Sequence, residues 1–191
     1  MPKHLMIAVD WFGPYSSVRE ANEAAKPWDW PGLYMLVGKV GSETVSRVQY
    51  VGISESLRGR LNSQHHKIGD TALETGAVTD LRIWLGEVAT AEPSGPKVKA
   101  TRATLNFAEW LHARFMKLPL NSMKTKGLPT RSVTVLNRWW KKDFATPYTR
   151  RPHLDWPNLI DYPHHDLPAR TVWFGGKQRV FTKADNYARP E

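Results

Sequence analysis

The chain has 191 residues and carries 27 Lys and Arg against 18 Asp and Glu, a formal net charge of +9 at pH 7. The basic balance favours a nucleic-acid partner, and the length predicts one domain with extensions. The absence of cysteine excludes a disulfide scaffold and a thiolate zinc site. No stretch has the length and apolar character of a membrane-spanning helix or a signal peptide, so we expect a cytoplasmic protein with no membrane partner.

Residues 1–31 are predicted to be an N-terminal extension of the domain. The apolar run over residues 5–9 is typical of a strand. Ser17 and Glu20 have the spacing of a capping box, so a short helix is expected from there to about residue 25.

Residues 32–125 form the predicted central domain. Their apolar, β-type runs and the glycine-containing loop between the first two runs indicate strands. The expected strands cover residues 32–38, 45–53 and 80–88.

A helix is expected to follow the second strand, over residues 54–67, with Ser54 as its N-cap. Leu57 and Leu61 lie one turn apart and would face the core, which puts Arg60 at the edge of that apolar face. The neighbouring Arg58 is predicted to be solvated.

A second helix is expected over residues 98–116, where residues recur at the spacing of one helix face. This inward stripe contains Leu105, Ala108, Glu109, His112 and Met116. A buried carboxylate is costly without a partner, so Glu109 either pairs with a cation of the protein or binds a metal ion.

Several of these residues form an ordered set. Gly32-Leu33-Tyr34 is followed by Tyr50-Val51-Gly52, and then by Arg60, Glu109 and Asn121. In order and spacing this set resembles the GIY-YIG nuclease family, over about residues 31–124. The resemblance implies an α/β fold in which helices flank a small mixed, mainly antiparallel sheet.

The resemblance also implies an activity, the hydrolysis of DNA phosphodiester bonds by an endonuclease of the restriction or mobile-element type that uses Mg²⁺ or Mn²⁺. Tyr34 would be the general base or a water-orienting hydroxyl, and Tyr50 would donate a hydrogen bond to water or phosphate. Arg60 would stabilise the charge of the phosphorane, Glu109 would ligate the metal, and Asn121 would support the site. Phosphodiester hydrolysis calls for groups of these types.

One position departs from the family pattern. Many members have His or Tyr four residues after this arginine, whereas this chain has Gln64, which takes up no proton at neutral pH. His65 is the predicted substitute, and His66 lies about 100° further around the helix. If no group has replaced the proton acceptor, the chain is a catalytically silent nucleic-acid-binding module with the same fold.

Residues 126–191 are predicted to be a basic, aromatic-rich C-terminal extension. Residues 131–143 interleave cations with tryptophans, which suits phosphate contacts and base stacking on DNA. The alternative is a helix with an apolar face and a solvated basic face. Gly175-Gly176 predicts a hairpin turn, whose strands either enter a DNA groove or cover the core.

The predicted partner is DNA, most simply the double-stranded form, and a homodimer is compatible with the sequence. A second hypothesis concerns zinc, because several potential ligands lie in proline-rich loops near the C-terminus, although their spacing matches no tight zinc pattern. These residues are His153, Asp155, His164, His165 and Asp166.

Overall fold

The computed structural model describes residues 4–27, 31–62, 78–90, 98–121, 129–164 and 166–182, which form a mixed α/β fold made mostly of strands. The strands are β1 (Leu5–Tyr15), β2 (Gly32–Lys39), β3 (Arg47–Ser54), β4 (Thr79–Ala89), β5 (Val133–Trp140), β6 (Leu159–Tyr162), β7 (Ala169–Trp173) and β8 (Lys177–Phe181). The helices in the described chain are α1 (Val18–Ala24), α2 (Leu57–Arg60) and α4 (Arg102–Phe115). None of these helices has the length and apolar character needed to cross a membrane.

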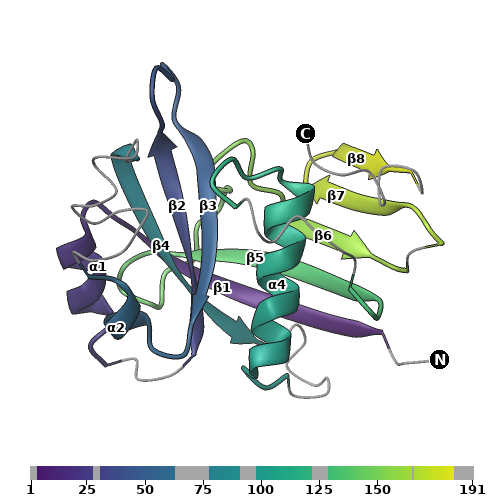
Figure 1. The fold of residues 1–191 in the computed structure, drawn as a ribbon, viewed down its shortest axis with the longest axis horizontal. Coiled ribbons are helices and arrows are strands. Elements are labelled where there is room, and N and C mark those ends of the chain that lie inside the picture. The colour runs from purple at the N-terminus through teal and green to yellow at the C-terminus, as the bar shows by residue number, and fades with distance from the viewer. Residues whose placement is uncertain are drawn as a thin grey trace.

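The described strands join one eight-stranded sheet in the order β3-β2-β4-β1-β5-β6-β7-β8 (Figure 1). Neighbouring strands run antiparallel except β1 and β5, which pair in parallel. The predicted mixed, mainly antiparallel α/β class is therefore confirmed. Because β1 lies between β4 and β5, the predicted N-terminal extension, central domain and C-terminal extension all contribute strands to one continuous sheet.

The central strand β1 is longer than the predicted run of residues 5–9. Trp11 and Phe12 are adjacent in sequence and both are buried, because both faces of the sheet are covered at this point. Pro14 lacks a backbone donor and would ordinarily end a strand. Here it falls at a shift of register between Phe12 and Tyr15, where the ladder with β4 is already interrupted.

The helices lie on opposite faces of the sheet. Helix α4 packs with Trp11, Leu33 and Met35, and its contacts reach from β3 to β6 (Figure 1). Side chains from α1 and α2 pack with Tyr34 and Leu36, which alternate with Leu33 and Met35 along β2. The face that carries Tyr34 is therefore the one covered by α1 and α2.

Two of the predicted helices begin at capped N-termini. In α1 the Ser17 hydroxyl accepts a hydrogen bond from the Glu20 amide at 3.1 Å, which is one half of the predicted capping box, and the Glu20 carboxylate accepts from the Ser16 amide at 2.7 Å. Helix α4 begins at Arg102 within the predicted residues 98–116, and Thr101 and Thr104 form a reciprocal capping box.

The start of α2 differs from the prediction. Its N-cap is Ser56, whose hydroxyl accepts from the Gly59 amide at 3.2 Å. Ser54 is still the last residue of β3, and its hydroxyl donates to the Ser56 carbonyl at 2.7 Å. Ser56 is the N-cap because Ser54 still belongs to β3, and the helical turn can begin only after the strand has ended.

Residues 133–140 form strand β5, so the alternative of an amphipathic helix over residues 131–143 is wrong. Val133, Val135 and Trp139 are buried on one face of this strand. The predicted hairpin near the C-terminus is confirmed as β7 and β8, and its turn residues Gly175 and Gly176 have φ angles of +109° and +108°. Such angles favour glycine.

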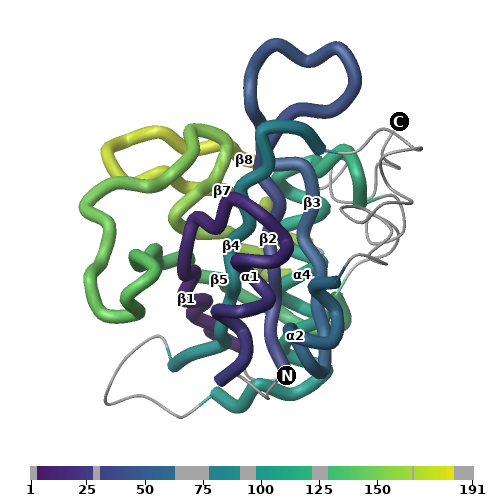
Figure 2. Tube along the Cα trace, turned by 90° about the vertical axis from the view of Figure 1, so that its left-hand side faces the viewer, coloured from purple at the N-terminus to yellow at the C-terminus, as the bar shows by residue number. Residues whose placement is uncertain are grey.

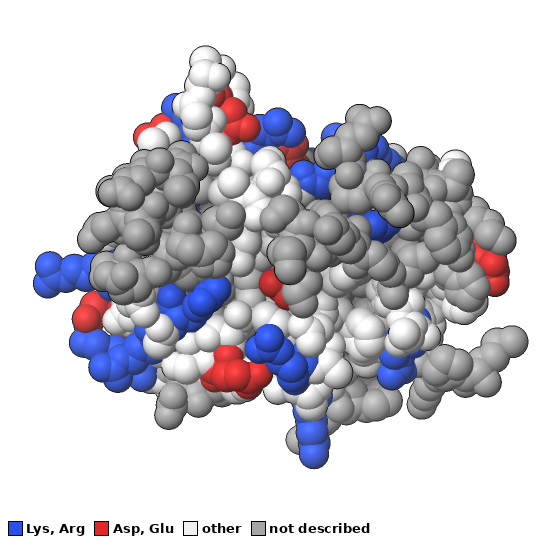
Figure 3. All heavy atoms as spheres, viewed as in Figure 1, with Lys and Arg blue, Asp and Glu red and all other residues white. Residues whose placement is uncertain are grey.

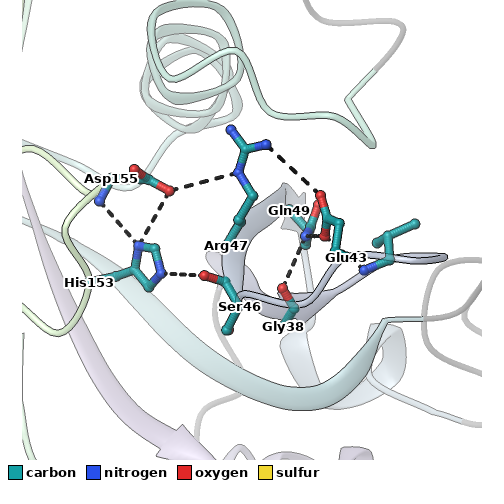
Figure 4. A network of polar contacts seen from close by, with 8 residues as sticks. Gly38, Glu43, Ser46, Arg47, Gln49, His153 and Asp155 are labelled. Carbon is teal, nitrogen blue, oxygen red and sulfur yellow. Dashed lines mark hydrogen bonds and ion pairs between the residues drawn. The ribbon is translucent and has the colours of Figure 1, made fainter.

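The turn between β2 and β3 projects beyond the neighbouring strands in both views (Figures 1 and 2). At its base the buried Gln49 amide donates to the Gly38 carbonyl at 3.0 Å and to the Glu43 carboxylate at 2.6 Å (Figure 4). On the other side His153 contacts the Ser46 carbonyl at 2.8 Å. The loop between β5 and β6 therefore fixes the base of this hairpin.

Candidate functional site

The two predicted tyrosines are neighbours on adjacent strands. Tyr34 of β2 pairs with Gly52 of β3, and Leu36 pairs with Tyr50, so both tyrosines point to the same face of the sheet. Their ring centroids are 5.8 Å apart at an interplanar angle of 40°. The structure thus brings together the tyrosines of the two sequence motifs.

The glycines of the two motifs leave room for specific side chains. A Cβ on Gly52 would lie 2.3 Å from the Tyr34 hydroxyl oxygen, so any larger residue would displace that ring. A Cβ on Gly32 would lie 2.7 Å from Cδ1 of Leu57, the first residue of α2. Gly52 therefore leaves room for the Tyr34 ring, and Gly32 leaves room for helix α2.

Arg60 is the last residue of α2 and lies next to Tyr34. Leu57 and Leu61 are fully buried, as predicted, and anchor the turn to the core, whereas Arg60 itself is exposed. Its Nε donates to the Tyr34 hydroxyl at 3.4 Å, which is long for a hydrogen bond. Arg58 is exposed, as predicted.

Burial dominates the protonation of both tyrosines. Desolvation raises the pKa of Tyr34 far above its ordinary value, and the opposing effect of Arg60 is smaller. Burial also raises the pKa of Tyr50. The hydrogen bond between the two hydroxyls adds to the raised pKa of Tyr34 and acts in the opposite direction on Tyr50.

Glu109 lies on the buried face of α4, with 5% of its surface exposed. Its negative charge is close enough to Tyr50 to help raise the pKa of that hydroxyl. The opposite charge of Arg60 acts on the same hydroxyl and lowers its pKa. The predicted cation and the predicted carboxylate thus both influence Tyr50, although α4 packs on the face of the sheet opposite to the one that carries the tyrosines.

The donor set around Glu109 fits one kind of metal site. No group of three or more His, Cys, Asp or Glu side chains that could hold a metal ion occurs among the described residues. Mg²⁺ is commonly held by one or two carboxylates, and water and substrate phosphate oxygens complete its shell. A single carboxylate therefore fits Mg²⁺ bound together with a phosphodiester, and not a cage built from protein ligands alone.

Asn121 binds the edge of the sheet. Its Oδ1 accepts from the Val51 amide at 2.9 Å, and its Nδ2 donates to the Val51 carbonyl at 2.7 Å. The Leu120 amide also donates to the Gln49 carbonyl at 3.0 Å. This segment satisfies the outer backbone groups of edge strand β3, so Asn121 supports the strand that carries Tyr50 without facing the tyrosine hydroxyls.

His65 and Gln64 lie outside the described residues, as does His66. The prediction that His65 replaces the usual proton acceptor is therefore left as it stands.

Several cations of the C-terminal segment are bound to other parts of the chain. Arg138 donates to both oxygens of Asp10, at 2.6 and 2.8 Å, and Lys142 donates to Glu20 at 2.5 Å. Trp139 is 5% exposed and cannot stack on a base in this conformation. These residues join β5 and the following loop to β1 and α1, which favours a structural role.

The view of Figure 3 shows Lys and Arg side chains in several separate groups, one of them over α1 and α2, with Asp and Glu between them. The positive charge of the chain is thus dispersed on this face and includes the region of α2.

The zinc hypothesis finds no support at His153. Its Nδ1 accepts from the Asp155 amide at 3.1 Å, which leaves the proton on Nε2 for donation to the Ser46 carbonyl (Figure 4). Both ring nitrogens are therefore engaged. His164 and Asp166 form a local pair, and His165 lies outside the described residues.

Sequence reasoning missed Asn22, whose side chain in α1 contacts the turn of α2 that carries Arg60. The sequence separation is 36 and 39 residues for its two contacts, and no local pattern connects such distant positions.

A comparison with protein-family models, curated proteins and solved structures found no match to this chain.

Proposed function

We propose that this protein is a divalent-metal-dependent endonuclease that hydrolyses DNA phosphodiester bonds. One observation carries the proposal. Tyr34, Tyr50 and Arg60 come from three separate elements and lie in contact, and the negative charge of Glu109 helps to raise the pKa of Tyr50. The ordered motifs that resemble the GIY-YIG family are thus also neighbours in space. A guanidinium in contact with a pair of tyrosine hydroxyls, and a carboxylate near enough to influence one of them, suit phosphodiester hydrolysis.

Arg60 is proposed to bind the scissile phosphate. It is exposed, and a guanidinium has five N–H donors, so contact of Nε with Tyr34 leaves donors for phosphate oxygens. Its charge would stabilise the additional negative charge of the pentavalent transition state.

The tyrosines are proposed to act as neutral hydroxyls. Tyr34 is fully buried and its pKa is strongly raised, which argues against a general-base role for its hydroxyl. Tyr50 is 8% exposed where Tyr34 is fully buried, and both Arg60 and Glu109 influence its pKa, so it is the better placed of the two to contact the attacking water or a phosphate oxygen. In this assignment Tyr34 holds Arg60 and Tyr50 in position.

Glu109 is proposed to hold Mg²⁺ or Mn²⁺, with phosphate oxygens and water as the other ligands. The ion would neutralise phosphate charge and lower the pKa of a bound water. The protein contributes a carboxylate that burial keeps in a fixed place on α4.

The test is nicking of a supercoiled plasmid with Mg²⁺ and with EDTA, by the wild type and by Glu109→Gln. Wild-type protein should nick the plasmid only with the metal, and Glu109→Gln should lose the activity while it keeps its fold and its affinity for DNA. Glu87→Gln is the matched control, because Glu87 is a half-buried carboxylate on β4. Undiminished nicking in EDTA, or by Glu109→Gln, contradicts the metal assignment.

The second candidate is a catalytically silent DNA-binding module. The complete burial of Tyr34 favours it, because a buried, protonated tyrosine cannot take a proton from water. Wild-type protein that binds DNA and cleaves none with Mg²⁺ or Mn²⁺ would establish this candidate in place of the endonuclease.

A further inference from the structure

The turn that carries Arg60 is bound by a side chain from a different helix. Nδ2 of Asn22 in α1 donates to the Arg58 carbonyl and to the Leu61 carbonyl, each at 2.7 Å. These two carbonyls lie on either side of Arg60 in the chain. The amide of Asn22 therefore fixes the backbone on both sides of the exposed arginine.

Helix α2 needs such a contact because it is one turn long. A single turn is unstable alone, and the carbonyls at a helix end have no partner within the helix. Ser56 caps the beginning of α2, and Leu57 and Leu61 hold one side of it in the core. Asn22 binds the carbonyls at the other end, next to the side that carries Arg60.

Asn22 is itself held on a well-anchored element. Ala21 and Ala25 are fully buried beside it, and Ser17 caps the helix. The Glu20 carboxylate accepts from the Ser16 amide at 2.7 Å and from the Lys142 ammonium at 2.5 Å. A chain of contacts thus runs from the loop after β5, through α1, to the turn that carries Arg60.

We propose that Asn22 is a positioning residue for Arg60, and that α1 is consequently part of the candidate active site. The proposal rests on the proposed function for its effect on cleavage, because Arg60 matters for a reaction only if the reaction occurs. The order of the α2 turn can be measured without any cleavage, so the two proposals can fail separately.

The first experiment compares Asn22→Ala with Glu23→Ala in single-turnover cleavage and in DNA binding. Glu23 is a matched control, since it is exposed on the same helix and pairs with Lys26. Asn22→Ala should slow the cleavage step by about ten- to a hundredfold, because small displacements of a catalytic group are costly, with DNA affinity changed less than about twofold. Glu23→Ala should change neither quantity.

A double substitution tests whether Asn22 acts through Arg60. In the Arg60→Ala background, Asn22→Ala should slow cleavage no further, because there is no guanidinium left to position. A second, equal loss of rate in that background would show that Asn22 acts in another way and would overturn the proposal.

The second measurement is amide hydrogen exchange by NMR. The Arg60 and Leu61 amides donate to the Ser56 and Leu57 carbonyls at 3.1 and 2.9 Å, so they report on the α2 turn. Asn22→Ala should speed their exchange by about tenfold, and Glu23→Ala should not.

Faster exchange in Asn22→Ala together with an inactive wild type would keep the positioning of Arg60 and reject the endonuclease. Unchanged exchange would overturn the positioning role, whatever the wild type does to DNA.

Discussion

Two buried polar clusters lie on opposite faces of the sheet, and they differ in where their hydrogen bonds lead. The tyrosine–arginine cluster (Tyr34, Tyr50 and Arg60) begins in the core and ends at an exposed guanidinium. The histidine–asparagine cluster (Trp11, His112 and Asn137) is at most 2% exposed at each member. The first is an open cluster, because its guanidinium can contact a ligand in solution. The second is a closed cluster, because all of its members are shielded from solvent.

The closed cluster satisfies its polar atoms within the protein. Trp11 Nε1 donates to Asn137 Oδ1 at 2.7 Å, and Asn137 Nδ2 donates to the Pro157 carbonyl at 3.0 Å. These contacts fix the orientation of the amide, because the Trp nitrogen only donates and the Pro oxygen only accepts. The cluster joins β1, β5 and the segment before β6, so its expected contribution is to stability and not to chemistry.

The largest expected effect is on the open cluster. Arg60→Ala should lower the single-turnover cleavage rate by about a hundredfold or more, because the charge of the transition state loses its cation. Arg58→Ala is the control, and it should weaken DNA affinity and flatten the dependence of log K on log salt by about one unit. The comparison breaks down if the large loss of rate occurs at Arg58.

Asn137→Ala should have the converse effect. It leaves the Trp11 and Pro157 groups buried without their partner, so the free energy of unfolding should fall by about 2–4 kcal/mol in urea titrations. The cleavage rate of the folded fraction should be unchanged. A loss of rate without a loss of stability would mean that the closed cluster communicates with the site.

Substitution of each tyrosine by Phe separates their roles within the open cluster. Tyr50→Phe should slow cleavage by about a hundredfold and Tyr34→Phe by about tenfold, because only Tyr50 is proposed to contact water or phosphate. Rates measured at saturating Mg²⁺ and DNA decide between them. An inactive Tyr34→Phe beside a nearly normal Tyr50→Phe would assign the direct role to Tyr34 and would require the site to open.

The pH dependence of stability reports on His112. Both of its ring nitrogens lie near acceptor oxygens, Ala108 at 2.7 Å and Asn137 at 2.9 Å, which favours the charged ring, but complete burial outweighs this and lowers its pKa. The unfolded chain then binds a proton more readily than the folded one, so stability should fall as the pH drops below about 6.5. Urea titrations of the wild type between pH 5 and 8 should show this fall, and those of His112→Gln should show less of it.

The elements that sequence patterns predicted well are those with local causes. Apolar runs located β2, β3 and β4, the glycine pair located the β7–β8 turn, and helical spacing placed Glu109 on the buried stripe of α4. The meeting of Tyr34 with Tyr50 follows from strand register, which the sequence motifs indicated only through their spacing.

The remaining features depend on contacts between distant segments. Alternation alone cannot show that β1 inserts between β4 and β5, because that requires the pairing partners. The cations of the C-terminal segment were interpreted either as contacts to DNA or as a solvated basic face, yet Arg138 binds Asp10 at a sequence separation of 128 residues. A charge near an aromatic residue has the same sequence signature whether its partner is a phosphate or a distant carboxylate.

The smallest expected effect concerns a pair of carboxylates that belongs to neither cluster. Asp10 of β1 and Glu87 of β4 are paired across the strands, on the same face of the sheet as Tyr34. Asp10 is neutralised by Arg138 and by the Trp140 indole, which donates at 2.9 Å. Burial, and next the charge of Asp10, raises the pKa of Glu87.

A raised pKa in the folded state means that Glu87 favours folding when it is protonated, and that this contribution is lost as the pH rises through its folded pKa. Glu87→Gln should therefore be slightly more stable than the wild type at pH 7, and the difference should disappear below about pH 4, where the wild-type carboxyl is also neutral. Thermal unfolding at the two pH values measures the effect, with the exposed Glu23→Gln as the control. Lower stability of Glu87→Gln at pH 7 would mean that the ionised carboxylate has a stabilising partner, and it would place this pair with the closed cluster.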